Sequence, residues 1–190
     1  MISTLIEMPR LRAVPFSDAH LTERYVGWLN DPGVTRYSDN RFRQHTMESC
    51  RRYLESFAGT PHHFWAIVTR DPQLGHVGNV NAYVDTNHSI ADVGILIGEG
   101  RAQGLGLGSE AWLGVCDFLL RIAGLRKVTA GTLEVNTPML RVMERCGMRP
   151  DGRRVRHQVW EGRETDMVHG ALFRDDWLAR YPYGPFTDPS

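Results

Sequence analysis

A glycine-rich run at residues 103–108, with the sequence QGLGLG, has the composition of a phosphate-binding loop. It follows a short apolar segment, residues 93–97, that predicts a strand buried on both faces, and it precedes a helical pattern that opens at Ser109. Glycine lets the backbone adopt positive φ and approach a ligand closely. Free N–H groups and the positive end of the helix dipole would then face an anion.

The spacing of these glycines excludes two common phosphate-binding motifs. Gly104, Gly106 and Gly108 do not fit the G-x-G-x-x-G fingerprint of dinucleotide sites, and no G-K-[ST] ends the run, as a nucleoside triphosphate loop requires. The strand, the glycine run and the helix together therefore predict an anion-binding loop of another kind.

Composition and charge exclude several classes of protein. The 22 basic and 22 acidic side chains give a formal net charge of +0, which offers no support for binding nucleic acid or an acidic membrane. The three cysteines, Cys50, Cys116 and Cys146, contain no CxxC pair, so we expect neither a disulfide framework nor a zinc site. The N-terminus does not resemble a signal peptide, and no apolar segment is long enough to span a membrane, which favours a cytoplasmic protein.

The order of the predicted elements indicates an α+β domain with a mixed central sheet flanked by helices. We expect one domain over residues 1–181 and a frayed tail over residues 182–190. Breakers at residues 30–33 and a polar loop at residues 36–45 separate two N-terminal helices. The predicted strands cover residues 11–16, 64–69, 76–84, 90–97, 127–133, 155–160 and 165–173, and the predicted helices cover residues 18–29, 46–57, 109–122, 136–145 and 175–181.

Two motifs resemble signatures of the GNAT superfamily of N-acetyltransferases. Residues 103–108 match its [QR]-x-x-G-x-[GA] pattern, and the following S-E-A leads into a helix as that pattern usually does. Asn136 and the downstream residues Met139, Val142, Glu144, Arg145, Gly147 and Met148 are similar to a second signature. The N-terminal strings WLND, VTRY and GN, with a terminal DW, resemble the Rim-type branch, whose members acetylate protein N-termini, sugar amines and other small amines. The resemblance covers nearly the whole chain and implies the GNAT fold.

The resemblance also implies that acetyl-coenzyme A (acetyl-CoA) is the co-substrate. Its pantetheine arm would lie between two splayed strands, and its pyrophosphate would rest on the amides of the glycine run. Asn136 would bond the arm near the thioester, or would simply cap its helix, a role that asparagine favours. The residues implied to bind acetyl-CoA are Ile95, Leu96, Ile97, Gln103, Gly104, Leu105, Gly106, Leu107, Gly108, Ser109 and Asn136.

Acetyl transfer to an amine requires loss of a proton from the ammonium and a donor for the oxyanion. Asp92, at the register where many relatives carry a catalytic acid, and Glu134, at the end of the facing strand, are the two candidate bases. The position where many relatives carry a catalytic tyrosine is Met143, so the thiolate would leave unaided or with help from Cys146. A thiol pKa of about 8.5 makes unaided departure tolerable. The histidines lack acidic partners at useful spacing, so no metal is expected.

The acceptor would be chosen by residues 28–45 and by the closing hairpin, residues 153–169. The candidate substrate-binding residues are Trp28, Tyr37, Arg41 and Phe42, which combine aromatic faces with positive charge. We expect a small-molecule amine such as an amino sugar as the acceptor. Protein N-termini or lysines are the alternative acceptors, and a non-catalytic acyl-CoA-binding module is an alternative from another class. Aromatic residues near the C-terminus permit a homodimer.

Overall fold

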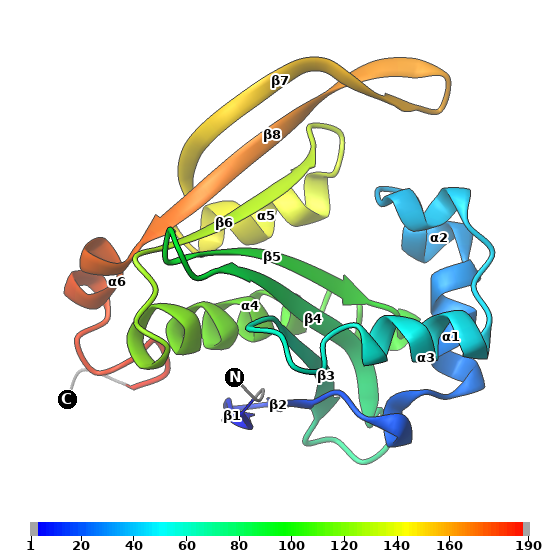
Figure 1. Cartoon of the computed structure of the whole chain (residues 1–190), viewed down its shortest axis with the longest axis horizontal. Helices are drawn as coiled ribbons and strands as arrows, with labels where there is room; N and C mark the ends of the chain where they lie inside the picture. The colour runs from blue at the N-terminus through cyan, green and yellow to red at the C-terminus, as the bar shows by residue number, and fades with distance from the viewer. Residues whose placement is uncertain (1–3, 188–190) are drawn as a thin grey trace.

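The computed structural model describes residues 4–187 and arranges them around an eight-stranded mixed sheet (Figure 1). The strands lie in the order β1-β2-β3-β4-β5-β6-β8-β7, and β5 and β6 are the parallel pair. The strands are β1 (Ile6–Glu7), β2 (Leu11–Pro15), β3 (His63–Thr69), β4 (His76–Asp85), β5 (Ile90–Ile97), β6 (Lys127–Leu133), β7 (Arg149–Trp160) and β8 (Arg163–Phe173).

Helices cover both faces of this sheet (Figure 1). The α-helices are α1 (Glu23–Asn30), α2 (Pro32–Thr35), α3 (Met47–Glu55), α4 (Leu107–Asp117), α5 (Thr137–Arg145) and α6 (Arg174–Arg180). Three short 3-10 turns, η1 (Asp18–His20), η2 (Asp39–Phe42) and η3 (Gly100–Ala102), lie between them, and α4 continues into a π-helical turn, η4 (Phe118–Ile122). None of the described helices is both long and apolar enough to cross a lipid bilayer.

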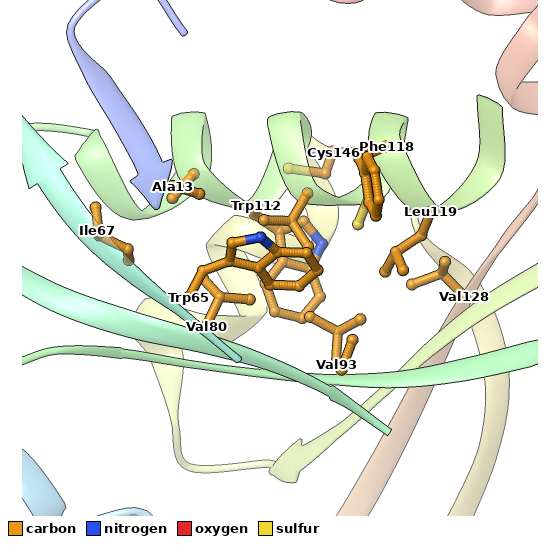
Figure 2. Packing of buried hydrophobic residues seen from close by; sticks show 14 of the residues in the cluster. Ala13, Trp65, Ile67, Val80, Val93, Trp112, Phe118, Leu119, Val128 and Cys146 are labelled. Carbon is orange, nitrogen blue, oxygen red and sulfur yellow. The ribbon is translucent and has the colours of Figure 1, made fainter. Parts of the chain in front are cut away.

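The main core lies between one face of the sheet and the helices α4, α5 and α6. Trp112 of α4 and Trp65 of β3 are fully buried at its centre. Figure 2 shows side chains from the helix pointing toward Val80 and Val93 of the strands beneath it. Trp177 of α6 donates from its indole nitrogen to Asp117 of α4 at 2.8 Å, which fixes the C-terminal helix against α4.

A second, smaller core on the opposite face holds α1 and α3 against β2, β3 and the end of β5. Phe16 stacks on Phe64 at 4.3 Å between ring centroids, and Tyr25 and Trp28 of α1 pack around them. The two cores fix the strands from both sides, so β4 and β5 are held rigidly where they approach the glycine run.

The N-terminal helices begin and end at other residues than the sequence predicts. The predicted helix over residues 18–29 is split, because the hydroxyl of Thr22 accepts the N–H of Tyr25 and so caps α1 one residue before Glu23. The predicted break at residues 30–33 contains the start of α2, because proline lacks an N–H and suits the first turn of a helix. The predicted loop at residues 36–45 contains η2.

The ends of the chain are more ordered than the sequence predicts. β1 pairs with β2 ahead of the first predicted strand. Phe186, in the segment predicted to be a tail, packs against the main core, and Arg121 donates to the carbonyl of Pro182 at 3.3 Å. Residues 188–190 of that segment lie outside the described residues.

Replacing Leu119 with alanine should destabilise the fold by about 2–5 kcal/mol, because it leaves a cavity at a fully buried position. Ile122→Ala is the matched control, since Ile122 lies on the same π-helical turn but is 69% exposed, and its cost should stay within about 0.5 kcal/mol. Urea unfolding monitored by tryptophan fluorescence measures the free energy of unfolding of both variants. Equal losses in the two variants would contradict this packing of η4.

Candidate functional site

A notch opens in the sheet between the two parallel strands. β5 pairs with β6 over three residue pairs, from Ile90–Lys127 to Asp92–Thr129. Beyond Asp92, β5 stays on β4 and β6 stays on β8, so among the described residues no ladder joins the facing edges of β5 and β6. Backbone polar groups require partners, and an extended ligand can supply them by adding to a strand edge. The predicted splay of these two strands is confirmed.

The strand that borders this notch is only partly buried. The prediction that residues 93–97 are buried on both faces is wrong, because Val93 is buried while residues 94–97 are half-buried. Gly94 lies against the carboxamide of Asn81, where a Cβ would come within 2.7 Å of the Asn81 oxygen. The small residue therefore lets a polar side chain of β4 lie directly beside the strand.

The glycine run leads directly into the first turn of α4. Gly106 is the residue before that helix and has φ of 78°, a left-handed conformation that glycine adopts without strain. The helix begins at Leu107, two residues before the predicted start, and its first i to i−4 bond runs from the Glu110 N–H to the Gly106 carbonyl. No capping side chain accepts a hydrogen bond from the N–H groups in the first turn of this helix. Those amides and the helix dipole together suit an anion.

Arg10 adds a positive charge to this loop. Its Nη1 donates to the Leu105 carbonyl at 2.9 Å, and its Nε forms an ion pair with the nearly buried Glu110 at 2.6 Å. The Arg10 side chain is 55% exposed, so the guanidinium stays accessible beside the loop. Gln103 ties the same loop to β5 by donating to the Ile97 carbonyl at 3.2 Å. Sequence analysis missed Arg10, because 95 residues separate it from Leu105 and no local pattern connects them.

A cavity of about 500 Å³ lies against β4 and β5, and its lining includes the part of β5 that borders the notch. Its walls come from α1, the segment around η2, α3, and the strands β4 and β5, including residues 94–96. Most of its polar lining is uncharged. Asn79 is 9% exposed, and within residues 4–187 its side-chain oxygen has no hydrogen-bond partner, while Nε2 of His45 is likewise buried and unpaired there. Such orphaned groups are costly to bury, so they favour a polar ligand at this position.

Asp92 lies where the notch begins. Its Oδ1 accepts a hydrogen bond from the Thr129 hydroxyl at 2.9 Å. Part of Asp92 reaches solvent, but the protein packed around its carboxylate raises the pKa, and the Thr129 hydroxyl and nearby His169 offset that rise in part. A carboxylate with a raised pKa holds protons more readily at moderate pH, which suits a group that exchanges protons with a substrate.

Glu134 has a different environment. One carboxylate oxygen forms an ion pair with Arg153 at 2.6 Å, and the other accepts the backbone N–H of Asp166 at 3.2 Å. Arg153 also bonds Asp166, whose pKa is lowered first by the backbone N–H of Arg156 and then by Arg153. Glu134 therefore anchors the base of the β7–β8 hairpin, and its carboxylate is engaged on both oxygens.

The second predicted motif forms α5. Asn136 caps this helix, since its Oδ1 accepts the N–H of Met139 at 3.3 Å while its Nδ2 donates to Thr132 at 2.9 Å. Its capping role is thereby confirmed. Met143 is buried and lies against Gly170. Cys146 is fully buried, and burial raises the pKa of its thiol to about 12, so it stays protonated and enclosed.

The four predicted substrate-binding residues do not line the cavity. Trp28 is buried against Gly98, whose lack of a Cβ makes room for the indole. Tyr37 stacks on Trp160 at the tip of the β7–β8 hairpin, with ring centroids 5.7 Å apart. Arg41 donates to the Val159 carbonyl of that hairpin at 3.2 Å, and Phe42 is 69% exposed. Neighbouring residues Ser38, Asp39, Asn40 and Arg43 do line the cavity.

The described histidines form no metal centre. Within residues 4–187, no three or more His, Cys, Asp or Glu side chains are grouped so that they could hold a metal ion. Burial lowers the pKa of His63 and of His76 to about 4 each, so both imidazoles are neutral near pH 7.

Comparisons with solved structures identify proteins of the same fold. A GNAT-family acetyltransferase from Bacillus anthracis has a TM-score of 0.76 at 20% identity, covering 90% of this chain and 99% of the other. The spermidine N-acetyltransferase of Vibrio cholerae in complex with CoA and spermine gives 0.78 at 17% identity, covering 89% and 98%. The ribosomal L7/L12 α-N-protein acetyltransferase RimL in complex with CoA gives 0.78 at 15%, covering 90% and 99%. Among curated proteins, none matches the chain.

The sequence itself matches one family model. Residues 10–149 match the acetyltransferase (GNAT) domain. That span contains the notch, the glycine run and α4, the elements that the GNAT resemblance assigns to acetyl-CoA. The chain therefore belongs to the GNAT family and is an acetyl-CoA-dependent N-acetyltransferase.

Proposed function

We propose that this enzyme transfers the acetyl group of acetyl-CoA directly to the primary amine of a small polar molecule, such as an amino sugar. The observation that carries the proposal is that two sites share one strand. Residues 94–96 of β5 lie in the part of the strand that β6 leaves unpaired, and the same residues line the cavity. An amine in the cavity and a thioester in the notch would meet across that strand, which favours attack in a ternary complex.

The lining of the cavity supports a neutral polar acceptor. Asn79, Asn81 and the hydroxyls of Tyr53 and Tyr83 contribute amide and hydroxyl groups, with the two tyrosine oxygens 2.9 Å apart. The carboxylate in the lining, Asp39, is 67% exposed. A polyamine, with several ammonium groups, would need more negative charge than this, whereas hydroxyl-rich molecules pair well with amides and hydroxyls.

We assign the pyrophosphate of acetyl-CoA to the amides of residues 103–109, next to the guanidinium of Arg10. The pantetheine arm would lie along Ile95, Leu96 and Ile97, in the strand edge that β6 leaves unpaired. Asn136, which already caps α5, lies just after β6 on the other side of the notch and is assigned to the thioester end of the arm.

We assign loss of the ammonium proton to Asp92, with Glu134 as the second carboxylate of the site. Asp92 begins the notch and keeps one carboxylate oxygen unengaged among the described residues. Backbone N–H groups at the unpaired edge of β5 would donate to the oxyanion. The three cysteines are buried and free, so direct transfer is favoured over an acetylated cysteine.

Thermal unfolding and thiol release together test the function. Acetyl-CoA at 100-fold over its Kd should stabilise the fold by about 2.7 kcal/mol. Thiol release should then occur with amino sugars and fail with spermidine and with peptides that carry a free N-terminus. Turnover with peptides would favour a protein acceptor instead. Stabilisation without turnover on any amine would favour a non-catalytic acyl-CoA-binding module.

Gly106→Asp should abolish measurable CoA binding by calorimetry, because it sets a negative charge and a strained backbone at the start of α4. Gly124→Asp is the matched control, since Gly124 has φ of 71°, close to the 78° of Gly106, and no neighbour within 4 Å of the added Cβ. The control should lose stability but retain CoA affinity. Unchanged CoA affinity in Gly106→Asp would contradict the assignment of this loop.

Asp92→Asn should lower kcat by about 100-fold, the scale of a lost general base, with little change in CoA affinity. Because burial raises the pKa of Asp92, the wild-type kcat/KM should fall as pH drops through a value above that of a free aspartate. The fall of kcat/KM at low pH should be altered in Asp92→Asn.

Glu134→Gln should lower the melting temperature and raise the KM for the amine more than it lowers kcat, because it weakens the anchor at Arg153. A loss of kcat in Glu134→Gln with none in Asp92→Asn would reverse the two assignments. Steady-state kinetics on the two variants, side by side, decides between them.

A further inference from the structure

His169 of β8 pairs with β6 two residues beyond Thr129, where the notch begins, and one of its ring nitrogens is buried without a partner among the described residues. It is opposite Gly131 of β6 in the sheet, and a Cβ on Gly131 would come within 2.9 Å of both Cε1 and Nδ1 of the imidazole. The ring can therefore lie across β6 only because residue 131 is a glycine. Its Nε2 is enclosed and forms no hydrogen bond within the described part of the chain. An orphaned buried nitrogen indicates a ligand or a water at that position.

Asp92 lies on the same face of the sheet as this imidazole. Asp92 is opposite Thr129, and Thr129 and Gly131 share one face of β6 because side chains alternate along a strand. The charge of His169 lowers the pKa of Asp92, in keeping with their positions on one face of the sheet. No hydrogen bond or ion pair joins them in residues 4–187, and neither Nε2 of His169 nor Oδ2 of Asp92 has a hydrogen-bond partner there.

The other charged groups near this pair have their own partners. Lys127, on the same face of β6, pairs with Asp151 at 2.7 Å and lies over the ring of Phe173. Gly152, opposite His169 on β7, has no side chain. Tyr83, opposite Asp92 on β4, bonds Tyr53 through its hydroxyl. Asp92 is thus the carboxylate that shares this face of the sheet with His169 and has no cationic partner among the described residues.

We propose that His169 is a catalytic residue that accepts the proton of the acceptor ammonium, and that Asp92 stabilises the imidazolium formed. This inference rests on the proposed function and changes one role in it: His169 takes the place of Asp92 as the immediate proton acceptor, and Asp92 acts on the imidazolium. Imidazole is the side chain most often used for this task. Its position explains how a buried nitrogen remains in the structure without a partner, since the substrate ammonium supplies the missing donor.

The acceptor ammonium carries three protons, and each of them has a destination in the transfer. One proton passes to Nε2 of His169, and the free amine attacks the thioester carbon, so that a C–N bond forms and the carbonyl electron pair moves to oxygen. When the C–S bond breaks, its electron pair goes to sulfur. The second proton leaves the nitrogen and reaches the thiolate to give free CoA, and the third stays on the amide. The imidazolium then releases its proton to solvent.

His169→Gln tests this role, with His88→Gln as the matched control on the exposed turn between β4 and β5. In His169→Gln, kcat should fall by about 100-fold or more, the scale of a lost general base, while the Kd for CoA and the melting temperature stay near wild type. His88→Gln should keep wild-type kinetics. Assays of thiol release give kcat and KM, and calorimetry gives the Kd for CoA.

Gly131→Ala provides a second test that keeps the imidazole. The added methyl would displace the ring, so kcat should fall while CoA affinity holds. A His169→Gln enzyme with kcat within about 3-fold of wild type would overturn the inference alone, since 100-fold is expected for a general base. Absence of turnover in the wild type with every amine would instead overturn the proposed function, and the inference with it.

Discussion

The three-residue ladder between β5 and β6 is the constraint on which the rest of the site depends. Because this ladder ends at Asp92, two strand edges inside the sheet lack partners, and a ligand can enter where a continuous sheet would exclude it. The same strand then ends at Ile97 and passes into the glycine run, which Gln103 ties back to it. The notch, the glycine run and the cavity therefore share one strand, and residues of that strand pack in both cores.

Four carboxylates near the site show how environment assigns roles. Glu110 is nearly buried and pairs with Arg10, which orients a guanidinium toward the loop. Glu134 and Asp166 both engage Arg153, and they hold the hairpin. Asp92 differs, because burial raises its pKa and no cation pairs with it among the described residues. Of these four carboxylates, Asp92 is therefore the one that we assign to the proton transfer.

The two walls of the site come from opposite ends of the chain. The β7–β8 hairpin curves away from the sheet toward α2 and η2 (Figure 1). At its tip Trp160 stacks on Tyr37 and donates from its indole nitrogen to the Arg36 carbonyl at 3.0 Å. This contact joins the segment before α3 to the hairpin, and two of the predicted substrate-binding residues, Tyr37 and Arg41, take part in the joint.

The sequence by itself determined the family and the α+β fold, and it singled out the glycine run as a candidate phosphate-binding loop, because glycine spacing, helix caps and strand periodicity are local properties. The strands at residues 90–97 and 127–133 were predicted with their observed bounds, and the cap at Asn136 was foreseen. Asp92 and Glu134 were equivalent candidates in the sequence, while Arg10 and His169 gave no signal. Only the tertiary structure separated them, since ion pairing, burial and the imidazole across Gly131 depend on the register of strands distant in the chain.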